Sequence, residues 1–266
     1  MGSNPLHQKL FLKVIFGGDH LKMTQTELEK TYKYHVANLK ELELALNHIE
    51  RLAKKEIATK DAQKSLTSLL RLYTFMLGAW AEVGLKKILY ESQGLNDGER
   101  TFILNKSTQI EQWQEVVELS FRKNFKIPKA KLEENLKRKD VAAYQKYIEI
   151  NKLINEDLRI IIEIRNKLAH GQWKYPFSEG CKIDGNKYQL INKENLLSLN
   201  FKYKILRTLA EMIHYIIVSP KTLDRDFNRY FCKISGLKNQ LDNRKYETYK
   251  NSLIEKRARY RANQSN

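Results

Sequence analysis

An arginine, an amide and a histidine lie close together near the middle of this chain, at Arg165, Asn166 and His170. An arginine guanidinium can hold two phosphate oxygens in its planar fork, and a histidine that titrates near neutral pH can carry protons to and from ribose hydroxyls. These residue types suit phosphodiester chemistry. Arginine and histidine also complement the dipole at many helix ends, and so short a pattern recurs by chance, so the motif alone leaves both interpretations open.

The spacing of Arg165 and His170 does not place them on one face of a straight helix. Successive residues turn by roughly 100°, so the two side chains point about 140° apart. Gly171 directly follows the histidine, and glycine often takes the left-handed conformation just past a helix end. We therefore expect the helix to end near His170, where the terminus can turn the imidazole.

The motif resembles the Arg-x(4–6)-His motif of the HEPN superfamily, in which a polar residue commonly follows the arginine, as Asn166 does here. The chain continues with HGQWxxPF from His170, then with the strings at 194–199 and 216–220, and in these it looks like the MAE_28990/MAE_18760-like branch of HEPN proteins. The resemblance spans roughly residues 24–230. It implies an up-and-down helical bundle, and much of the superfamily consists of metal-independent RNases.

The resemblance also implies a composite site. In HEPN nucleases the motifs of two domains usually face each other across a dimer, so two copies of Arg165, Asn166 and His170 would share one cleft. The two histidines would divide the base and acid roles, the arginines would stabilise the pentavalent phosphate, and Asn166 would orient RNA or the histidine. By analogy, the biological role would be that of a toxin or an antiviral defence effector, with an antitoxin or regulatory protein as a further partner.

The rest of the chain offers no other catalytic motif and no carboxylate cluster for paired Mg²⁺ ions. A nuclease built on these residues would therefore use neither a metal nor another cofactor. That restriction points to RNA, because a ribose 2′-hydroxyl can attack its own phosphate and leave a 2′,3′-cyclic phosphate and a 5′-hydroxyl. The alternative is a noncatalytic RNA-binding or regulatory interaction module, since a shared fold does not guarantee activity.

The charge balance favours a polyanionic partner. The chain has 48 Lys and Arg residues against 31 Asp and Glu residues, a formal charge of +17. Such an excess attracts nucleic acid at long range, although a lysine-rich source proteome would also produce it. With 42% hydrophobic residues in 266, the chain can also bury a full core.

The cysteines and the apolar stretches indicate in which cellular compartment the protein is expected. Cys181 and Cys232 form no metal-ligand spacing and are too few to staple a secreted protein of this length, which fits a reducing cytoplasm. The early apolar run Leu10–Phe16 contains Lys13 and is too short to span a bilayer. We therefore expect neither a signal peptide nor a membrane partner.

Hydrophobic periodicity predicts four or more long helices. The first begins at a capping box of Thr24 and Glu27 and follows a seam that includes His35, which we expect to be a partly buried, hydrogen-bonded core residue. After a turn at 58–60, a second helix covers 66–88, and its small residues permit close packing. Glu82 in this helix needs a cation or a water-filled groove beside it. It is either a site-facing acid or part of one exposed turn, and we favour the exposed turn.

The second half divides into an insertion, the motif helix and an extension. Residues 93–139 are a polar insertion with a short helix at 110–122 and a basic stretch at 122–131, which either extends the RNA-contacting surface or is solvated. Asp140 caps the motif helix, a small β-hairpin turns at Asp184, and a last long helix covers 194–218. The predicted units are therefore 1–23, the helical domain 24–220, and a basic, helical extension 221–266. In that extension Tyr246, Tyr249 and Tyr260 either stack on bases or lie on a solvated helix.

Overall fold

The computed structural model describes residues 23–59, 63–91, 94–128 and 130–264. Within these ranges the chain forms eleven α-helices and no β-strand, so the predicted all-α bundle is confirmed. The α-helices are α2 (Gln25–Thr59), α3 (Gln63–Leu89), α4 (Asp97–Leu104), α5 (Gln109–Phe125), α6 (Leu132–Lys139), α7 (Val141–Leu153), α8 (Arg159–Ala169), α9 (Gly185–Lys193), α10 (Leu196–Val218), α11 (Pro220–Asn243) and α12 (Tyr246–Gln264).

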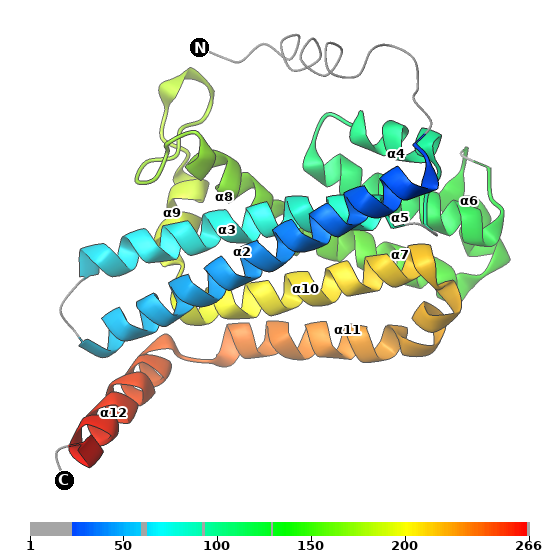
Figure 1. Cartoon of the computed structure of the whole chain (residues 1–266). Coiled ribbons are helices and arrows are strands. Elements are labelled where there is room, and N and C mark those ends of the chain that lie inside the picture. Colours follow the sequence, from blue (N-terminus) through cyan, green and yellow to red (C-terminus); the bar gives the residue numbers. More distant parts are fainter. Residues whose placement is uncertain (1–22, 60–62, 92–93, 129, 265–266) are drawn as a thin grey trace.

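Four long helices form the body of the bundle. Helices α2, α3, α10 and α11 lie along a similar direction, and α2 packs on α3 while α10 packs on both α3 and α11 (Figure 1). Helix α8 packs on α3, and the short helices α4, α5 and α6 gather at one end of the bundle (Figure 1). Helix α3 is therefore the element that links the central core to the helix carrying the motif.

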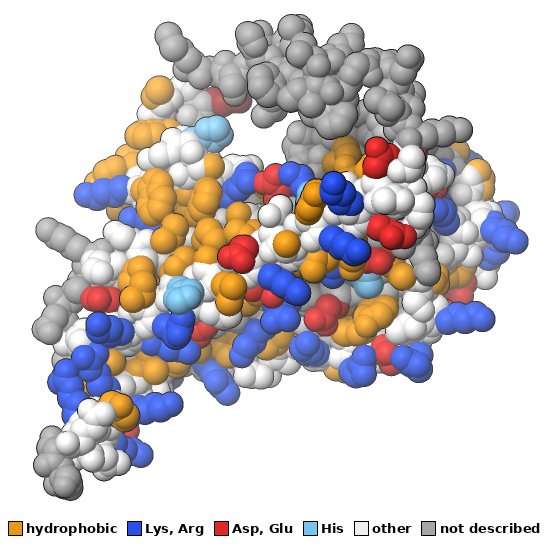
Figure 2. Space-filling view, in the orientation of Figure 1, with side chains coloured by type: hydrophobic (Ala, Val, Ile, Leu, Met, Phe, Trp, Pro, Cys, Tyr) orange, Lys and Arg blue, Asp and Glu red, His pale blue; other side chains and the backbone are white. Residues whose placement is uncertain are grey.

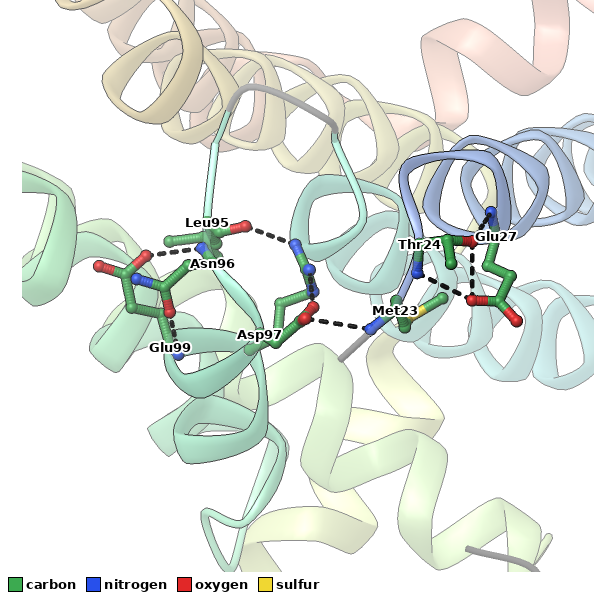
Figure 3. A network of polar contacts seen from close by, with 8 residues as sticks. Met23, Thr24, Glu27, Leu95, Asn96, Asp97 and Glu99 are labelled. Carbon is green, nitrogen blue, oxygen red and sulfur yellow. Dashed lines mark hydrogen bonds and ion pairs between the residues drawn. The ribbon is translucent and has the colours of Figure 1, made fainter. Parts of the chain in front are cut away.

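The start of α2 is fixed by the predicted capping box and by a contact with α4. The Glu27 N–H donates to Thr24 Oγ1 at 3.2 Å, and the Thr24 N–H donates to Glu27 Oε2 at 2.8 Å. The bond from the Thr24 N–H to the Glu27 carboxylate, together with one from the Thr24 hydroxyl, lowers the pKa of the Glu27 carboxyl. The Met23 N–H donates to Asp97 Oδ2 at 3.1 Å, and the buried Arg100 donates to the same carboxylate (Figure 3). The capping box is confirmed, and the polar network ties the first helix to the short helices.

His35 on α2 is a packed residue, as predicted. Its side chain is partly buried, and its ring centroid lies 5.2 Å from that of Tyr90. Burial, followed by the charge of Lys86, lowers the pKa of this imidazole. The expected hydrogen bond is not seen at Nδ1, which is buried without a partner among the described residues.

The segment predicted as a polar insertion contributes to the main core. The helix expected at 110–122 is present as α5, where Trp113 is fully buried and shares one hydrophobic cluster with residues of α3 and α10. A capping box of Thr108 and Glu111 begins α5. This packing is why the segment does not behave as a merely solvated loop.

The motif helix covers the predicted range but is less regular than its periodicity suggests. It begins at α7, where Asp140 Oδ1 accepts the Ala143 N–H at 2.9 Å, so the predicted cap is confirmed. A π-helical turn at Ile154–Leu158 then joins α7 to α8. The inserted turn changes which residues face the core, and α8 points its buried face, Ile161, Ile162, Ile164 and Leu168, at its neighbours.

The predicted β-hairpin is wrong. A single antiparallel bridge joins Phe177 and Ile183, and the chain then enters α9 instead of a second strand. Asp184 accounts for the difference, because its carboxylate accepts the Lys187 N–H at 3.0 Å and so caps a helix. The apolar residues after Gly185 follow a helical period, which buries Ile191.

The predicted C-terminal extension, 221–266, is in part integrated into the helical bundle. The helix predicted at 194–218 is present as α10, and α11 begins at Pro220 and buries Phe227, Tyr230 and Ile234 in the core cluster. Helix α12 projects from the opposite end of the bundle to α4 (Figure 1) and rests on α2, where Tyr249 packs against an apolar cluster. Of the three tyrosines considered for base stacking, Tyr260 is exposed, whereas Tyr246 and Tyr249 are partly buried.

The predicted N-terminal segment, with the apolar run Leu10–Phe16, lies outside the described residues except for Met23. Every helix in the part of the chain that the structure describes is too short or too polar to cross a lipid bilayer.

Candidate active site

The end of α8 has the geometry that the sequence predicts. Gly171 has a φ of 75°, its N–H donates to the Leu168 carbonyl at 3.1 Å, and the Gln172 N–H donates to the Lys167 carbonyl at 3.0 Å. These two bonds define a Schellman motif with a left-handed glycine. His170 is the last residue before that glycine, and its side chain is exposed. The helix terminus therefore presents the imidazole to solvent.

Arg165 points in a different direction, toward α3. Its side chain is 24% exposed and forms an ion pair with Glu82 through Nη2. Gly78 permits this approach, because a Cβ atom at that position would lie 2.3 Å from the Arg165 Cβ atom. The arginine is thus held in the contact between α3 and α8, and Gly78 has the packing role that the sequence predicts for the small residues of α3.

Asn166 completes the motif on the arginine side. Its Oδ1 atom accepts a hydrogen bond from Arg165 Nη1 at 3.1 Å. The structure therefore brings Arg165, Asn166 and Glu82 together. It does not bring His170 to them, since the imidazole makes no hydrogen bond or ion pair with any described residue of the single chain.

Glu82 lies between two cations. Its Oε1 atom is 2.9 Å from Lys86 Nζ, and its Oε2 atom contacts Arg165. Burial alone would raise the pKa of the Glu82 carboxyl, but the hydrogen bonds and charges of Lys86 and Arg165 hold it below its ordinary value. The preference for a merely exposed turn is therefore wrong, because Glu82 is a half-buried acid that contacts the motif arginine.

The pairing limits what Arg165 can do in the single chain. One Nη atom donates to Glu82 and the other to Asn166, while Nε is buried without a partner among the described residues. An incoming phosphate must share the remaining Nη donors with Glu82 or displace it. Glu82 thus holds the arginine in place and also competes with any anion that binds it.

An aromatic loop lies beside the motif. In the sequence its residues contributed only to the likeness to HEPN proteins and were not predicted to belong to the site. Residues Trp173, Tyr175 and Phe177 follow His170 and are each at least one third exposed. The Phe177 N–H donates to Gln172 Oε1 at 2.7 Å, which holds the loop against the helix end. The sequence feature that could have predicted this loop as part of the site is the run of aromatic residues just after the histidine.

Metal ligands do not gather in the described ranges, which contain no cluster of three or more His, Cys, Asp or Glu side chains able to hold an ion. Cys181 and Cys232 are exposed free thiols.

No protein-family model, curated protein or solved structure matches this chain. The likeness to HEPN proteins therefore stays a prediction that rests on the motif and the residues after it.

Proposed function

We propose that this protein is a metal-independent endoribonuclease of the HEPN type. The observation that carries the proposal is the end of α8, where an exposed His170 lies five positions after an arginine that α3 holds in place. The first group can transfer protons and the second can neutralise charge on a phosphate. Together they supply what RNA cleavage without a metal requires.

The reaction begins when a histidine base removes the proton from a ribose 2′-hydroxyl. The resulting oxyanion attacks the adjacent phosphorus, and the bond from phosphorus to the 5′-oxygen of the next nucleotide breaks. A histidine acid protonates that leaving oxygen, so the products carry a 2′,3′-cyclic phosphate and a 5′-hydroxyl. Arg165 stabilises the extra negative charge on the pentavalent phosphate.

A second copy of the chain fits this chemistry. One imidazole cannot accept the proton of the 2′-hydroxyl and donate a proton to the leaving 5′-oxygen in the same step. In the single chain His170 contacts Asn166 only through its backbone N–H, and its imidazole makes no hydrogen bond or ion pair with a described residue. A homodimer with two motifs facing one cleft would place a second His170 and a second Arg165 at the same phosphate. We therefore propose a composite site, with the charge of +17 attracting RNA to it.

The second candidate function is a noncatalytic RNA-binding or regulatory module. The ion pair between Arg165 and Glu82 favours it, because an arginine neutralised by a neighbouring acid is a weaker phosphate ligand.

For the proposed enzyme, the analogy with HEPN nucleases suggests a biological role. By that analogy, we place the enzyme in the cytoplasm as a toxin or antiviral defence effector. An antitoxin or another regulatory protein would then cover the cleft or release Arg165.

The test compares cleavage of mixed RNA and matched DNA in excess EDTA by the wild type, His170→Ala and His48→Ala. His48 is an exposed histidine on α2, so its replacement is a matched control. We expect the wild type and His48→Ala to cut RNA alone, and His170→Ala to lose at least 10²-fold in rate. RNA that is bound tightly but left intact by the wild type would instead support the noncatalytic module, and equal cleavage by His170→Ala would remove the proposed role of the histidine.

A further inference from the structure

Exposed aromatic side chains gather beside the end of α8. Twelve large hydrophobic residues are exposed among the described residues, and five of them lie within 173–188. Figure 2 shows hydrophobic side chains gathered over this loop and α9. Four of the five are aromatic, and they form what we call the aromatic surface: Trp173 (37% exposed), Tyr175 (42%), Phe177 (40%) and Tyr188 (38%). Contiguous exposed apolar surface is a common feature of binding sites.

Two rings of the aromatic surface are arranged before any ligand binds. Tyr175 in the loop and Tyr188 on α9 lie parallel, with 3° between their planes and 5.8 Å between their centroids. The loop is closed by a hydrogen bond of 2.8 Å from the Asp184 N–H to the Pro176 carbonyl. Because the rings are already ordered, binding to them costs little side-chain entropy.

The same helix that carries His170 supports this surface. Ile191 of α9 packs in one cluster with Ile164 and Leu168 of α8, and Lys187 Nζ lies 2.5 Å from Glu163 Oε2. Helix α9 is thus fixed to α8 by both apolar and ionic contacts. The position of the Tyr188 ring relative to the motif helix is therefore set by packed structure.

The charges around the rings favour an anionic ligand. Lys174 and Lys182 are exposed, and the Lys174 Nζ atom lies 5.2 Å from the centroid of the Tyr175 ring. Aromatic faces interleaved with lysines are typical of surfaces that bind single-stranded nucleic acid, where bases stack on the rings and lysines meet the phosphates. Bases inside an RNA duplex are already paired and stacked, so they cannot reach such rings.

We infer that the aromatic surface stacks unpaired bases next to the phosphate at His170, and that the substrate is therefore single-stranded RNA. The part of the inference that concerns the substrate rests on the proposed ribonuclease function. The stacking itself does not need cleavage. Single-stranded DNA should also bind here, because stacking does not use the 2′-hydroxyl, but it should not be cut.

Trp173 provides a direct probe of this binding. The other two tryptophans, Trp80 and Trp113, are 4% and 0% exposed, so a stacked base can quench only Trp173 strongly. We would titrate the full-length His170→Ala protein in EDTA with a single-stranded RNA and with a duplex of the same length, and follow tryptophan fluorescence. We expect the single strand to quench and the duplex to quench much less. The Trp173→Phe version should show no such quenching but should still bind the single strand.

Paired substitutions separate stacking from a merely apolar contact. Leucine keeps apolar bulk but has no ring face, so Tyr175→Leu and Tyr188→Leu should each weaken single-strand binding about 5- to 150-fold. Tyr175→Phe and Tyr188→Phe, which keep the ring, should bind like the parent. Circular dichroism and the mass in solution are measured for each variant.

Equal quenching by duplex and single strand, or binding of the single strand without any change at Trp173, would overturn the inference. It would also fall if the leucine variants bound RNA normally while the mass in solution dropped to a monomer, since the surface would then hold a second protein chain. Quenching without cleavage by the wild type would leave the stacking intact and remove the ribonuclease. Cleavage without quenching would remove the stacking and leave the proposed ribonuclease intact.

Discussion

The contact between Gly78 of α3 and Arg165 of α8 makes a sharp prediction for Gly78→Ala. The added methyl carbon would lie 2.3 Å from the Arg165 Cβ atom and 2.5 Å from its Cγ atom. Rotation of the side chain can move Cγ away, but it cannot move Cβ, because Cβ is attached directly to the backbone. Since ordinary carbon contacts begin near 3.4 Å, α3 and α8 must separate locally by about 1 Å.

Two opposing terms set the change in stability. Replacing a glycine by alanine inside a helix stabilises it by about 1 kcal/mol. Overpacking of this kind costs about 1–3 kcal/mol. Gly78→Ala should therefore lower the free energy of unfolding by up to about 2 kcal/mol. Displacement of Arg165 by about 1 Å should also lower the rate of RNA cleavage on the order of 10²-fold.

Gly84→Ala on the same helix is the matched control. The nearest atom to its added carbon is in the Trp80 ring at 3.6 Å, an ordinary contact, so this variant should gain about 1 kcal/mol and keep its activity. Urea denaturation followed by circular dichroism measures both variants, and cleavage rates follow on the same preparations. If Gly78→Ala proved as stable and as active as Gly84→Ala, the close approach of α3 and α8 at the motif would be refuted.

Three further predictions address the arginine, the loop and the response to pH. Arg165→Lys keeps the charge but removes the planar fork, so RNA cleavage should fall about 10²-fold while the melting temperature changes little, and unchanged cleavage would contradict the phosphate clamp. Asp184→Ala removes the cap of α9 and should cost about 1 kcal/mol in urea denaturation, whereas Asp184→Asn should keep most of it. Burial, assisted by the charge of Lys87 and only partly offset by Glu91, lowers the pKa of His214. The unfolded chain therefore takes up a proton first, so stability should fall as the pH drops below about 6.5, and His214→Gln should show a smaller fall than the wild type in melting experiments at a series of pH values.

Local signals in the sequence are enough to predict much of this fold. The caps at Thr24 and Asp140 and the left-handed Gly171 depend on residues within one turn of each other, so each was predictable without knowledge of the tertiary structure. The wrong prediction of a β-hairpin at Asp184 also comes from reliance on local signals. An aspartate followed by glycine suits both a tight turn and a helix start, and only the packing of Ile191 on α8 decides between them.

The site was harder to predict because its contacts join distant parts of the chain. Arg165 and Glu82 are 83 positions apart, and their pairing depends on how closely α3 and α8 approach at Gly78. The burial of Trp113 in the main core likewise depends on the fold and not on the polar residues around it. The motif residues could therefore be chosen from the sequence, but the acid that holds Arg165 could only be named as a possibility.

A single measurement tests the central proposal most directly. An RNA that the wild type cuts at one site would be remade with a 2′-deoxy sugar on the 5′ side of that phosphate, and the ends of all products would be analysed. We predict that cleavage at this one linkage disappears, and that the unmodified RNA yields a 2′,3′-cyclic phosphate and a 5′-hydroxyl. Continued cutting at the deoxy linkage, or products with a 3′-hydroxyl and a 5′-phosphate, would contradict attack by the 2′-hydroxyl and with it the proposed roles of His170 and Arg165.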